Sequence, residues 1–454
     1  MRTVLIANRG EIAVRIARTC REMGLRTVAV YSRADADAAV LDLADEAVCI
    51  GEGAPRRSYL DTLALLEAAV QRGADAVHPG YGFLSENADF AELCAAAGLT
   101  FVGPPAPVMA ALGDKIAARR TMADAGVPVL PGSAGPVRDE RELLRVGAEI
   151  GYPFMVKAAA GGGGRGIRLT SHPGAAPAAF RETRHDAAAL FGDDRVYLER
   201  YVEQARHLEV QILADGHGNV VSLGERDCTV QRRHQKLVEE SPAPGLDPAT
   251  REALHDAAVR GARRAGYVGA GTWEFLLDAA GRFHFTEVNC RLQVEHPVTE
   301  MVTGVDIVRQ QLLIADGQRL DLPGVTSRGA AVECRINAED PQRGFLPTAG
   351  LITDFRPPGG PFTRVDTHCY GGCRIPAHYD SLLAKVITWG ADRAEVLARM
   401  DRALAELVVA GPGIRTTAPF LRTILADPRF AAARHTTTLL DPPVAEAQYS
   451  ATTS

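Results

Sequence analysis

Lysine is the residue that this sequence most conspicuously lacks. Only four of its 50 basic residues are lysines: Lys115, Lys157, Lys236 and Lys385. The compact ammonium of lysine and the planar guanidinium of arginine are not interchangeable where geometry is tight. In an arginine-rich chain, a remaining lysine therefore indicates a position that requires one, although random compositional drift is an alternative. For Lys385, which lies in an apolar run, a structural ion pair and a functional role are equally open.

Long apolar runs and blocks of basic residues are also missing. No run approaches the ~18 apolar residues that cross a bilayer. The net charge is -6 and the pI is about 6.1, which argues against a nucleic-acid partner. The chain starts with MRTVLIANRG, which enters a strand directly and has no signal-peptide pattern. We therefore expect a cytoplasmic protein with no membrane partner.

The eight cysteines are scattered, and only Cys369 and Cys373 lie close together, in CYGGC. A zinc site usually takes two such pairs, or one pair with histidines, and His368 and His378 are nearby. Reduced structural thiols are the favoured interpretation, and a zinc site is the alternative.

The hydrophobic pattern predicts an α/β protein, α+β overall, with several domains in its 454 residues. Residues 1–113 alternate short apolar strands with helical segments, which is typical of a parallel sheet. Residues 114–327 form a mixed unit, residues 328–446 a third unit rich in strands, and residues 447–454 a tail. Within these units we expect antiparallel strands over 196–238 and 268–290, a loop over 171–180 and a helix over 393–409.

A glycine-rich loop, Gly161–Ile167, follows the strand that ends near Lys157. Glycines allow successive backbone N–H groups to point together at a phosphate. The loop lacks the Gly-Lys-Ser/Thr of a P-loop, and a flexible linker is the alternative. A lysine on a strand beneath a mobile glycine loop is one known way to hold ATP phosphates.

A hairpin predicted over residues 270–290 brings two carboxylates together. A four-residue loop, Ala279–Arg282, places Glu274 opposite Glu287, where like charges destabilise a sheet. A divalent cation would remove that penalty, and Asn289 lies two residues further on the same face. Two carboxylates and an amide oxygen suit Mg²⁺ or Mn²⁺. The alternative is an edge hairpin whose carboxylates point to water.

If this strand stays extended, Arg291, Gln293 and Glu295 continue the same face. An arginine, an amide and a carboxylate beside a metal-bound phosphate form a plausible site for a small anion. Arg291 would bind the anion and Glu295 could act as a general base.

A cluster of cations, QRRHQK, lies at residues 231–236. If this segment is a strand, Arg232, His234 and Lys236 share one face. The alternative is a solvated charged strand.

These motifs resemble the ATP-grasp enzymes and, among them, the biotin carboxylases. The resemblance covers nearly the whole chain and rests on ANRGEIAVRI, HPGYGFLSEN, GDK, KAAAGGGGRGI, ERDCTVQRRHQKLVEESPAP, EVNCRLQVEHPVTE, VECRINAEDP and HYDSLLAKV. It implies a biotin carboxylase N-terminal domain, an ATP-grasp domain with a mobile lid over about residues 130–203, and a C-terminal domain with a mixed β-sheet. It also implies a reaction in which ATP phosphorylates bicarbonate to carboxyphosphate, and N1′ of biotin is then carboxylated.

The resemblance implies a role for each matching residue. For ATP, these are Lys115 and Lys157 at the phosphates, the loop Gly162, Gly163, Gly164, Arg165 and Gly166 above them, Glu199 and Val202 at adenine, and His207, Gln231 and His234 near the ribose. Glu274, Glu287 and Asn289 would hold the metal. Lys236, Arg291, Gln293 and Val294 would hold bicarbonate, Glu295 would deprotonate it, and Arg335 and Tyr81 would bind biotin. Three positions depart from the usual pattern: Ala159–Ala160, Arg200 and Cys290.

The expected partners also follow from the resemblance. No Met-Lys-Met string of a biotin carrier occurs, so a separate biotin carboxyl carrier protein and a carboxyltransferase subunit are expected, with a homodimer as the assembly. The final carboxyl acceptor stays open. Two alternatives are another ATP-grasp ligase that joins an acid to an amine, and a non-catalytic nucleotide sensor or scaffold. A non-catalytic member would be expected to have lost a metal ligand or the base, and none of these residues is lost in this sequence.

Overall fold

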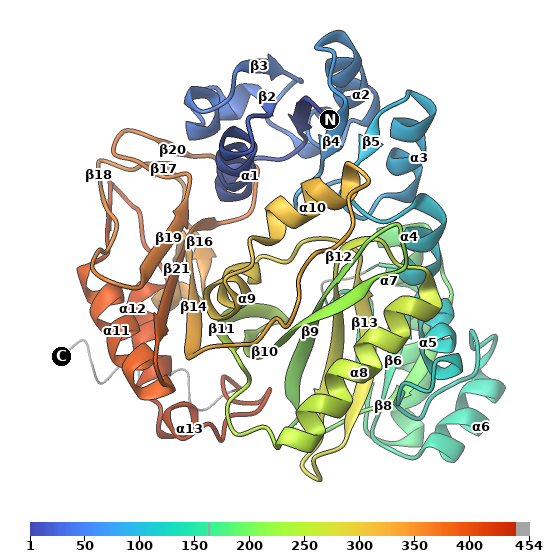
Figure 1. The fold of residues 1–454 in the computed structure, drawn as a ribbon. Coiled ribbons are helices and arrows are strands. Elements are labelled where there is room, and N and C mark those ends of the chain that lie inside the picture. Colours follow the sequence, from blue (N-terminus) through green and yellow to red (C-terminus); the bar gives the residue numbers. More distant parts are fainter. Residues whose placement is uncertain (162–163, 442–454) are drawn as a thin grey trace.

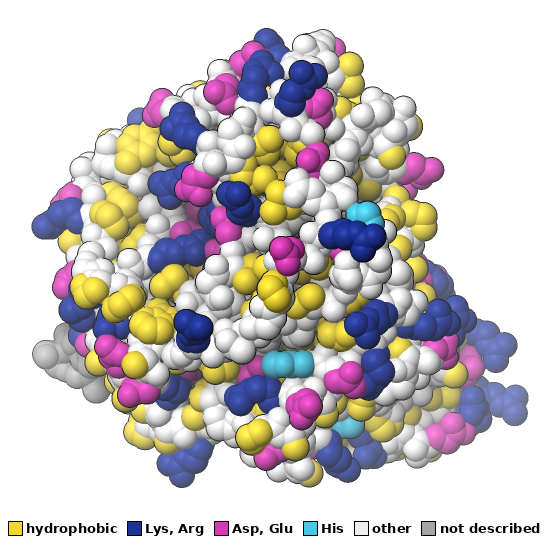
Figure 2. Space-filling view, in the orientation of Figure 1, with side chains coloured by type: hydrophobic (Ala, Val, Ile, Leu, Met, Phe, Trp, Pro, Cys, Tyr) yellow, Lys and Arg dark blue, Asp and Glu magenta, His cyan; other side chains and the backbone are white. Residues whose placement is uncertain are grey.

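The structure is a computed structural model that describes residues 1–161 and 164–441. Gly162, Gly163 and the predicted tail at 447–454 therefore lie outside the described residues. Within the described ranges, no helix combines the length and apolar character needed to cross a membrane. In the view of Figure 2, cationic and anionic side chains are interspersed over the surface.

The N-terminal residues form the predicted parallel sheet. Its strands are, in spatial order, β3 (Glu46–Cys49), β2 (Arg26–Tyr31), β1 (Thr3–Ile6), β4 (Ala76–His78) and β5 (Thr100–Phe101), and all neighbours are parallel. The connections carry α1 (Gly10–Glu22), α2 (Thr62–Gln71) and α3 (Ala88–Ala96). Every residue of β1 is buried, as expected for a central strand covered on both faces.

A three-stranded antiparallel sheet follows, after α4 (Ala106–Gly113) and α5 (Lys115–Asp124). Its order is β7 (Ile167–Thr170), β6 (Phe154–Ala158) and β8 (Val196–Arg200), and α6 (Glu140–Ile150) and α7 (Ala176–Phe191) share its apolar core. The loop predicted over 171–180 is wrong in its second half, because α7 begins at Ala176. The proline there occupies the first helical turn, where its missing N–H leaves no hydrogen bond unmade.

The largest sheet is antiparallel and has eight strands. Its order is β13 (Phe283–Asn289), β12 (Gly269–Leu277), β9 (Arg206–Ala214), β10 (Val220–Arg232), β11 (Gln235–Ser241), β14 (Ala330–Asn337), β21 (Leu382–Gly390) and β19 (Thr363–Thr367). The helices near it are α8 (Pro248–Ala265), α9 (His296–Thr303) and α10 (Ile307–Ala315) (Figure 1). The pairing of β11 with β14 carries this sheet across residues 327 and 328, where the sequence predicted a boundary.

The remaining C-terminal elements are helices that pack with the large sheet and short strands that pair with one another. They are α11 (Arg393–Glu406), α12 (Ala418–Leu425), α13 (Pro428–Ala431) and the short strands β15 (Glu339–Asp340), β16 (Leu346–Pro347), β17 (Gly350–Leu351), β18 (Asp354–Arg356), β20 (Arg374–Ile375) and β22 (Val408–Ala410). The helix predicted over 393–409 ends at Glu406, because the next residues leave it to pair with β18.

Candidate active site

A cavity of about 980 Å³ lies among the three parts of the chain. It brings together most of the residues that the sequence singled out, which come from separate elements of the fold. Its walls include Tyr81, Lys115, Lys157, Gly164, Glu199, Val202, His207, Gln231, His234, Lys236, Glu274, Glu287, Asn289, Arg291, Gln293, Val294 and Arg335. Arg165, Gly166 and Glu295 are not among the lining residues. The guanidinium of Arg165 lies 5.7 Å from the ring centre of Phe191 instead. A space of this size accommodates a nucleotide-sized ligand.

Lys115 and Lys157 lie in the same wall of the cavity and are each paired with a carboxylate. Lys115 begins α5, whose N-cap Asp114 accepts from two backbone N–H groups, and its Nζ is 2.9 Å from Glu287 Oε2. Lys157 Nζ, on β6, donates to Glu199 Oε2 at 2.7 Å. Burial would lower the pKa of Lys115, but the negative charge of Glu287 raises it. Both lysines are therefore cations at neutral pH.

The β12–β13 hairpin does pair Glu274 with Glu287, although by a different path from the predicted one. Leu277 faces Phe283, so the loop is one residue longer than expected. A β-bulge at Thr286, between the pairs Glu274–Glu287 and Phe275–Phe285, restores the register. The predicted loop, Ala279–Arg282, was therefore one residue too short, whereas the predicted pair of carboxylates is confirmed.

Lysines already offset the repulsion between these two carboxylates. Lys236 Nζ donates to Glu274 Oε1 at 2.9 Å, and His207 Nε2 lies 3.1 Å from Glu274 Oε2. Burial would raise the pKa of Glu274, but Lys236 and His207 lower it. Repulsion across the hairpin is thus no argument for a metal by itself. The case for a metal depends on the oxygen donors, which include Asn289, whose Nδ2 donates to Glu274 Oε1 at 2.8 Å.

The strand does not stay extended beyond Asn289, as the sequence had suggested. β13 ends there, and residues 290–295 form an irregular segment that leads into α9, with Glu295 at the N-cap position. The side chains nevertheless converge. Arg291 Nη1 donates to Gln293 Oε1 at 2.9 Å, and Arg291 Nη2 donates to Asn289 Oδ1 at 3.2 Å.

The QRRHQK segment is a hairpin turn rather than one strand. β10 ends at Arg232, β11 begins at Gln235, and the two residues between them, Arg233 and His234, have φ of 50° and 65°. Arg232 consequently points away from the cluster, with its guanidinium 3.8 Å from the ring centre of Phe345. The turn pairs Gln231 with Lys236 instead.

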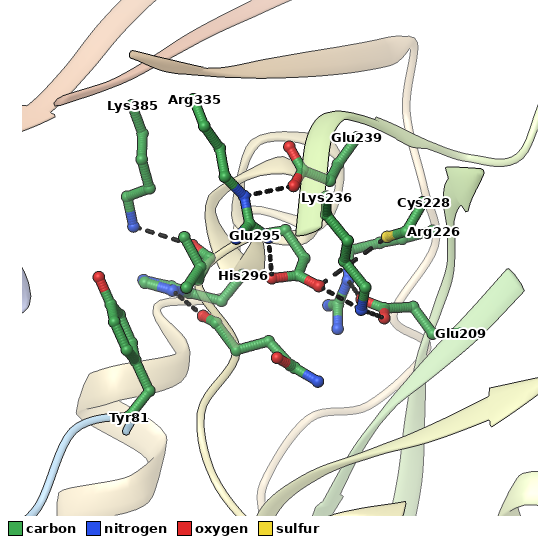
Figure 3. Close-up of polar contacts among 12 residues, drawn as sticks. Tyr81, Glu209, Arg226, Cys228, Lys236, Glu239, Glu295, His296, Arg335 and Lys385 are labelled. Carbon is green, nitrogen blue, oxygen red and sulfur yellow. Dashed lines mark hydrogen bonds and ion pairs between the residues drawn. The ribbon is translucent and has the colours of Figure 1, made fainter. Parts of the chain in front are cut away.

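Glu295 lies at the centre of the charged network, with its side chain fully buried (Figure 3). Its Oε1 accepts from Lys236 Nζ at 2.7 Å, and its Oε2 accepts from Arg335 Nη2 at 3.0 Å. Burial would raise the pKa of Glu295, but Lys236, Arg335 and Arg226 hold it well below its usual value. Glu295 is therefore an ionised carboxylate held by two cations, Lys236 and Arg335, which themselves line the cavity.

Sequence reasoning missed three charged residues of this network: Glu209, and also Arg226 and Glu239, which lie within the quoted motif ERDCTVQRRHQKLVEESPAP. Lys236 Nζ also donates to Glu209 Oε2 at 2.5 Å, and the buried Arg226 donates to Glu209 Oε1 at 2.5 Å. Arg335 Nε donates to Glu239 Oε1 at 2.6 Å. Burial raises the pKa of Glu239 to about 7, although Arg335 acts to lower it. The contacts of Glu209 link β9 with β10 and β11, and the pair of Arg335 with Glu239 links β14 with β11 across 96 residues of chain.

Glu86 was also missed, although it lies within the quoted motif HPGYGFLSEN. Its Oε2 accepts from Arg291 Nε at 2.8 Å, and its Oε1 accepts from the backbone N–H of Cys290 at 2.9 Å. The N-terminal unit thereby fixes the segment that carries Arg291.

Potential metal ligands cluster only near the cavity within the described ranges. The groups are His207, Glu209 and Glu274, and Glu209, Cys228 and Glu295. Cys369 and Cys373 are buried free thiols that pack with apolar residues such as Ile352 and Leu383. Their surroundings favour the structural interpretation over a zinc site.

Three comparisons with known proteins place the chain. Three family models match successive parts of the chain. They are the biotin carboxylase N-terminal domain over residues 1–109, the carbamoyl-phosphate synthase L chain ATP-binding domain over 114–322, and the biotin carboxylase C-terminal domain over 333–442. A biotin carboxylase of Nostoc sp. is 53% identical over 429 residues, which cover 94% of this chain and 96% of the relative. The chain belongs to the biotin carboxylase family. It is an ATP-dependent ligase that carboxylates biotin.

Solved biotin carboxylases share the whole fold. The structure of a Campylobacter jejuni biotin carboxylase in a β,γ-ATP complex has a TM-score of 0.94 at 46% identity, with coverage of 96% of this chain and 98% of that one. The biotin carboxylase domain dimer of Hydrogenobacter thermophilus 2-oxoglutarate carboxylase, with MgADP and bicarbonate, has a TM-score of 0.93 at 45% identity, and 96% of each chain is covered. Family membership favours biotin carboxylation over an amine ligase or a scaffold.

Two of the departures from the usual biotin carboxylase pattern have a structural account. Arg200 lines the cavity, and its Nη2 donates to the carbonyl of Ile150, the last residue of α6, at 2.6 Å. Cys290 is buried, and it is the backbone of Cys290 that contacts Glu86. Neither position removes a charged group from the cavity.

Proposed function

We propose that the cavity binds ATP at one end and bicarbonate beside Glu295 at the other, with biotin next to Arg335. The observation that carries this proposal is the buried, ionised Glu295 between Lys236 and Arg335, with Arg291 and Gln293 close by. A carboxylate surrounded by cations can accept a proton from a small anion that those cations attract.

At the nucleotide end, phosphate oxygens would replace carboxylates as partners of Lys115 and Lys157. Lys157 now holds Glu199, so phosphate binding would release the Glu199 carboxylate toward adenine. We propose that residues 130–203, which include Gly164, Arg165 and Gly166, act as the lid. The backbone of Val202 would contact adenine, and His207, Gln231 and His234 would lie near the ribose. This exchange of partners would couple lid closure to nucleotide binding.

A divalent cation fits the donors of the β12–β13 hairpin. Glu274, Glu287 and Asn289 offer two carboxylates and an amide oxygen in the cavity wall, which is the donor set that Mg²⁺ or Mn²⁺ prefers. The ion would neutralise phosphate charge. Lys115 and Lys236 already touch the two carboxylates and would keep them ionised and oriented toward the cavity.

At the bicarbonate end, Lys236, Arg291, Gln293 and the Val294 backbone would bind the anion. The cations that keep Glu295 ionised also weaken it as a base. An anion that binds Lys236 would compete with Glu295 for that ammonium and raise the proton affinity of the carboxylate. Glu295 would then take the proton from bicarbonate. A bicarbonate oxygen would attack the γ-phosphate of ATP, the bond from the γ-phosphorus to the bridging oxygen would break, and ADP would leave.

For biotin, we assign Arg335 to the ureido oxygen and Tyr81 to the wall of the pocket. A guanidinium fixed by Glu239 and Glu295 is pre-organised to stabilise the negative charge that develops on that oxygen in the enolate. Biotin would be delivered by a carrier protein, and a carboxyltransferase would use the product. A homodimer and a cytoplasmic location remain predictions.

The substitution Glu295→Gln tests the proposal. It keeps the shape of the side chain and removes the base, so bicarbonate-dependent ATP hydrolysis should fall by about 10²–10⁴-fold while the affinity for ATP stays near that of the wild type. Phosphate release and nucleotide binding are measured on the same preparation. Glu225→Gln is the matched control, because Glu225 is equally buried and paired with Arg251, outside the cavity. Unchanged turnover in Glu295→Gln would remove Glu295 as the base.

A further inference from the structure

Lys385 is the one lysine that the proposed roles leave unused. It lies on β21 with its side chain fully buried, at 0% exposure. Across the sheet it faces Arg335 on β14 on one side and Asp366 on β19 on the other. Lys385 is therefore the direct sheet neighbour of the residue assigned to biotin.

The ammonium of Lys385 connects three parts of the chain. Its Nζ donates to the backbone carbonyl of Val294 at 2.9 Å and lies 3.0 Å from Glu11 Oε1 on α1. The same Glu11 oxygen accepts a hydrogen bond from the hydroxyl of Tyr81. Asp366 Oδ2 is further away, at 3.8 Å. A single charged group thus touches the segment before Glu295 and, through Glu11, the tyrosine on the other wall of the cavity.

The contact with Val294 bears directly on Glu295. The Val294 carbonyl belongs to the peptide plane that joins Val294 to Glu295, and that plane is rigid. Holding the carbonyl therefore fixes the orientation of the Glu295 N–H and the start of α9. In Figure 3 the Lys385 ammonium and the Tyr81 ring lie on the same side of this segment, opposite Lys236.

We propose that Lys385 is a positioning residue for the reaction. It holds the Val294–Glu295 peptide directly and Tyr81 through Glu11, and so fixes the positions of these two groups relative to each other. This inference rests on the proposed roles of Glu295 and Tyr81. It assigns Lys385 a role beyond that of a structural ion pair, because a backbone carbonyl next to the base is one of its partners. A lysine suits the position because its compact ammonium reaches both acceptors in a closed space, where the planar fork of arginine would need more room.

The test compares Lys385→Met with the double variant Lys385→Met/Glu11→Gln. The single change leaves Glu11 buried without its counter-charge, whereas the double change restores neutrality and keeps an oxygen for the Tyr81 hydroxyl. In both variants the Val294 carbonyl loses its donor. Arg251→Met is the control, because it also removes a cation that pairs with a buried glutamate, Glu225, and neither of these residues lines the cavity.

For the folded double variant, kcat of bicarbonate-dependent ATP hydrolysis should fall by about 10–100-fold and the KM for bicarbonate should rise. The KM for ATP should stay within about twofold of the wild type. Lys385→Arg, measured beside it, should not restore kcat, while Arg251→Met should keep both KM values.

A folded double variant with wild-type kcat and wild-type KM for bicarbonate would overturn the inference, as would an equal change in Arg251→Met. These results leave the proposed function intact. A wild-type enzyme whose phosphate release ignores bicarbonate would instead contradict the proposed function itself, so the two failures are distinguishable.

Discussion

At the scale of single residues, the rarity of lysine proved to be an informative signal. Lys115, Lys157 and Lys236 all line the cavity, and Lys385 contacts the segment beside it. Their chemistry could be inferred because a compact cation is needed where carboxylates and, by proposal, phosphates or bicarbonate compete for it. The carboxylates that hold these cations could not be inferred in the same way. Glutamates are common, and only the fold distinguishes the ones in contact.

Arg335 gives a prediction at this scale. Arg335→Ala should lower the rate of biotin carboxylation by about 10²–10³-fold, because the developing ureido charge loses its donor. Bicarbonate-dependent ATP hydrolysis should fall less. It should not be fully spared, because Arg335 Nη2 also holds Glu295 Oε2 at 3.0 Å. Carboxybiotin formation and phosphate release are measured in parallel, and equal losses in both would contradict a role centred on biotin.

At the scale of elements, local patterns predicted which segments are strands but not where they bend. The Glu274–Glu287 pair was found from the sequence, yet the bulge at Thr286 was not, because no residue there requires one. The segment after Asn289 was expected to continue as a strand. It turns instead, and contacts with Glu86 fix Cys290 and Arg291 in place. Such tertiary contacts are absent from any local pattern.

The hairpin carries the prediction at the element scale. Glu287→Gln should raise the Mg²⁺ concentration needed for half-maximal ATP hydrolysis by ~10-fold or more, because one anionic oxygen donor is lost. Lys115 should remain in place, since the amide oxygen can still accept from its ammonium. The measurement is a Mg²⁺ titration of phosphate release at fixed ATP.

Asp278→Asn is the control for that titration, because Asp278 lies at the opposite end of the same hairpin and its carboxylate accepts from the loop N–H groups. It should leave the Mg²⁺ requirement unchanged. A Glu287→Gln enzyme with a wild-type Mg²⁺ titration would remove Glu287 from the metal site.

At the scale of the whole molecule, the sequence predicted the α/β class and the parallel N-terminal sheet, and both are confirmed. It did not predict that one eight-stranded sheet runs from β13 to β19 through both later units. β11 and β14 pair through backbone positions separated by about ninety residues of chain, such as Glu239 and Glu333, and such a pairing leaves no local trace in the sequence. This sheet places Lys236 and Arg335 on adjacent strands and so lets them share Glu295.

The most direct test of the whole account is phosphate release from Mg-ATP by the full chain, with and without bicarbonate and with and without free biotin. We expect release that requires bicarbonate and increases when biotin is added, because Glu295 acts on bicarbonate and the carboxyphosphate is then consumed. Release that is indifferent to both compounds would contradict the assignment of Lys236, Arg291 and Glu295 to a bicarbonate site.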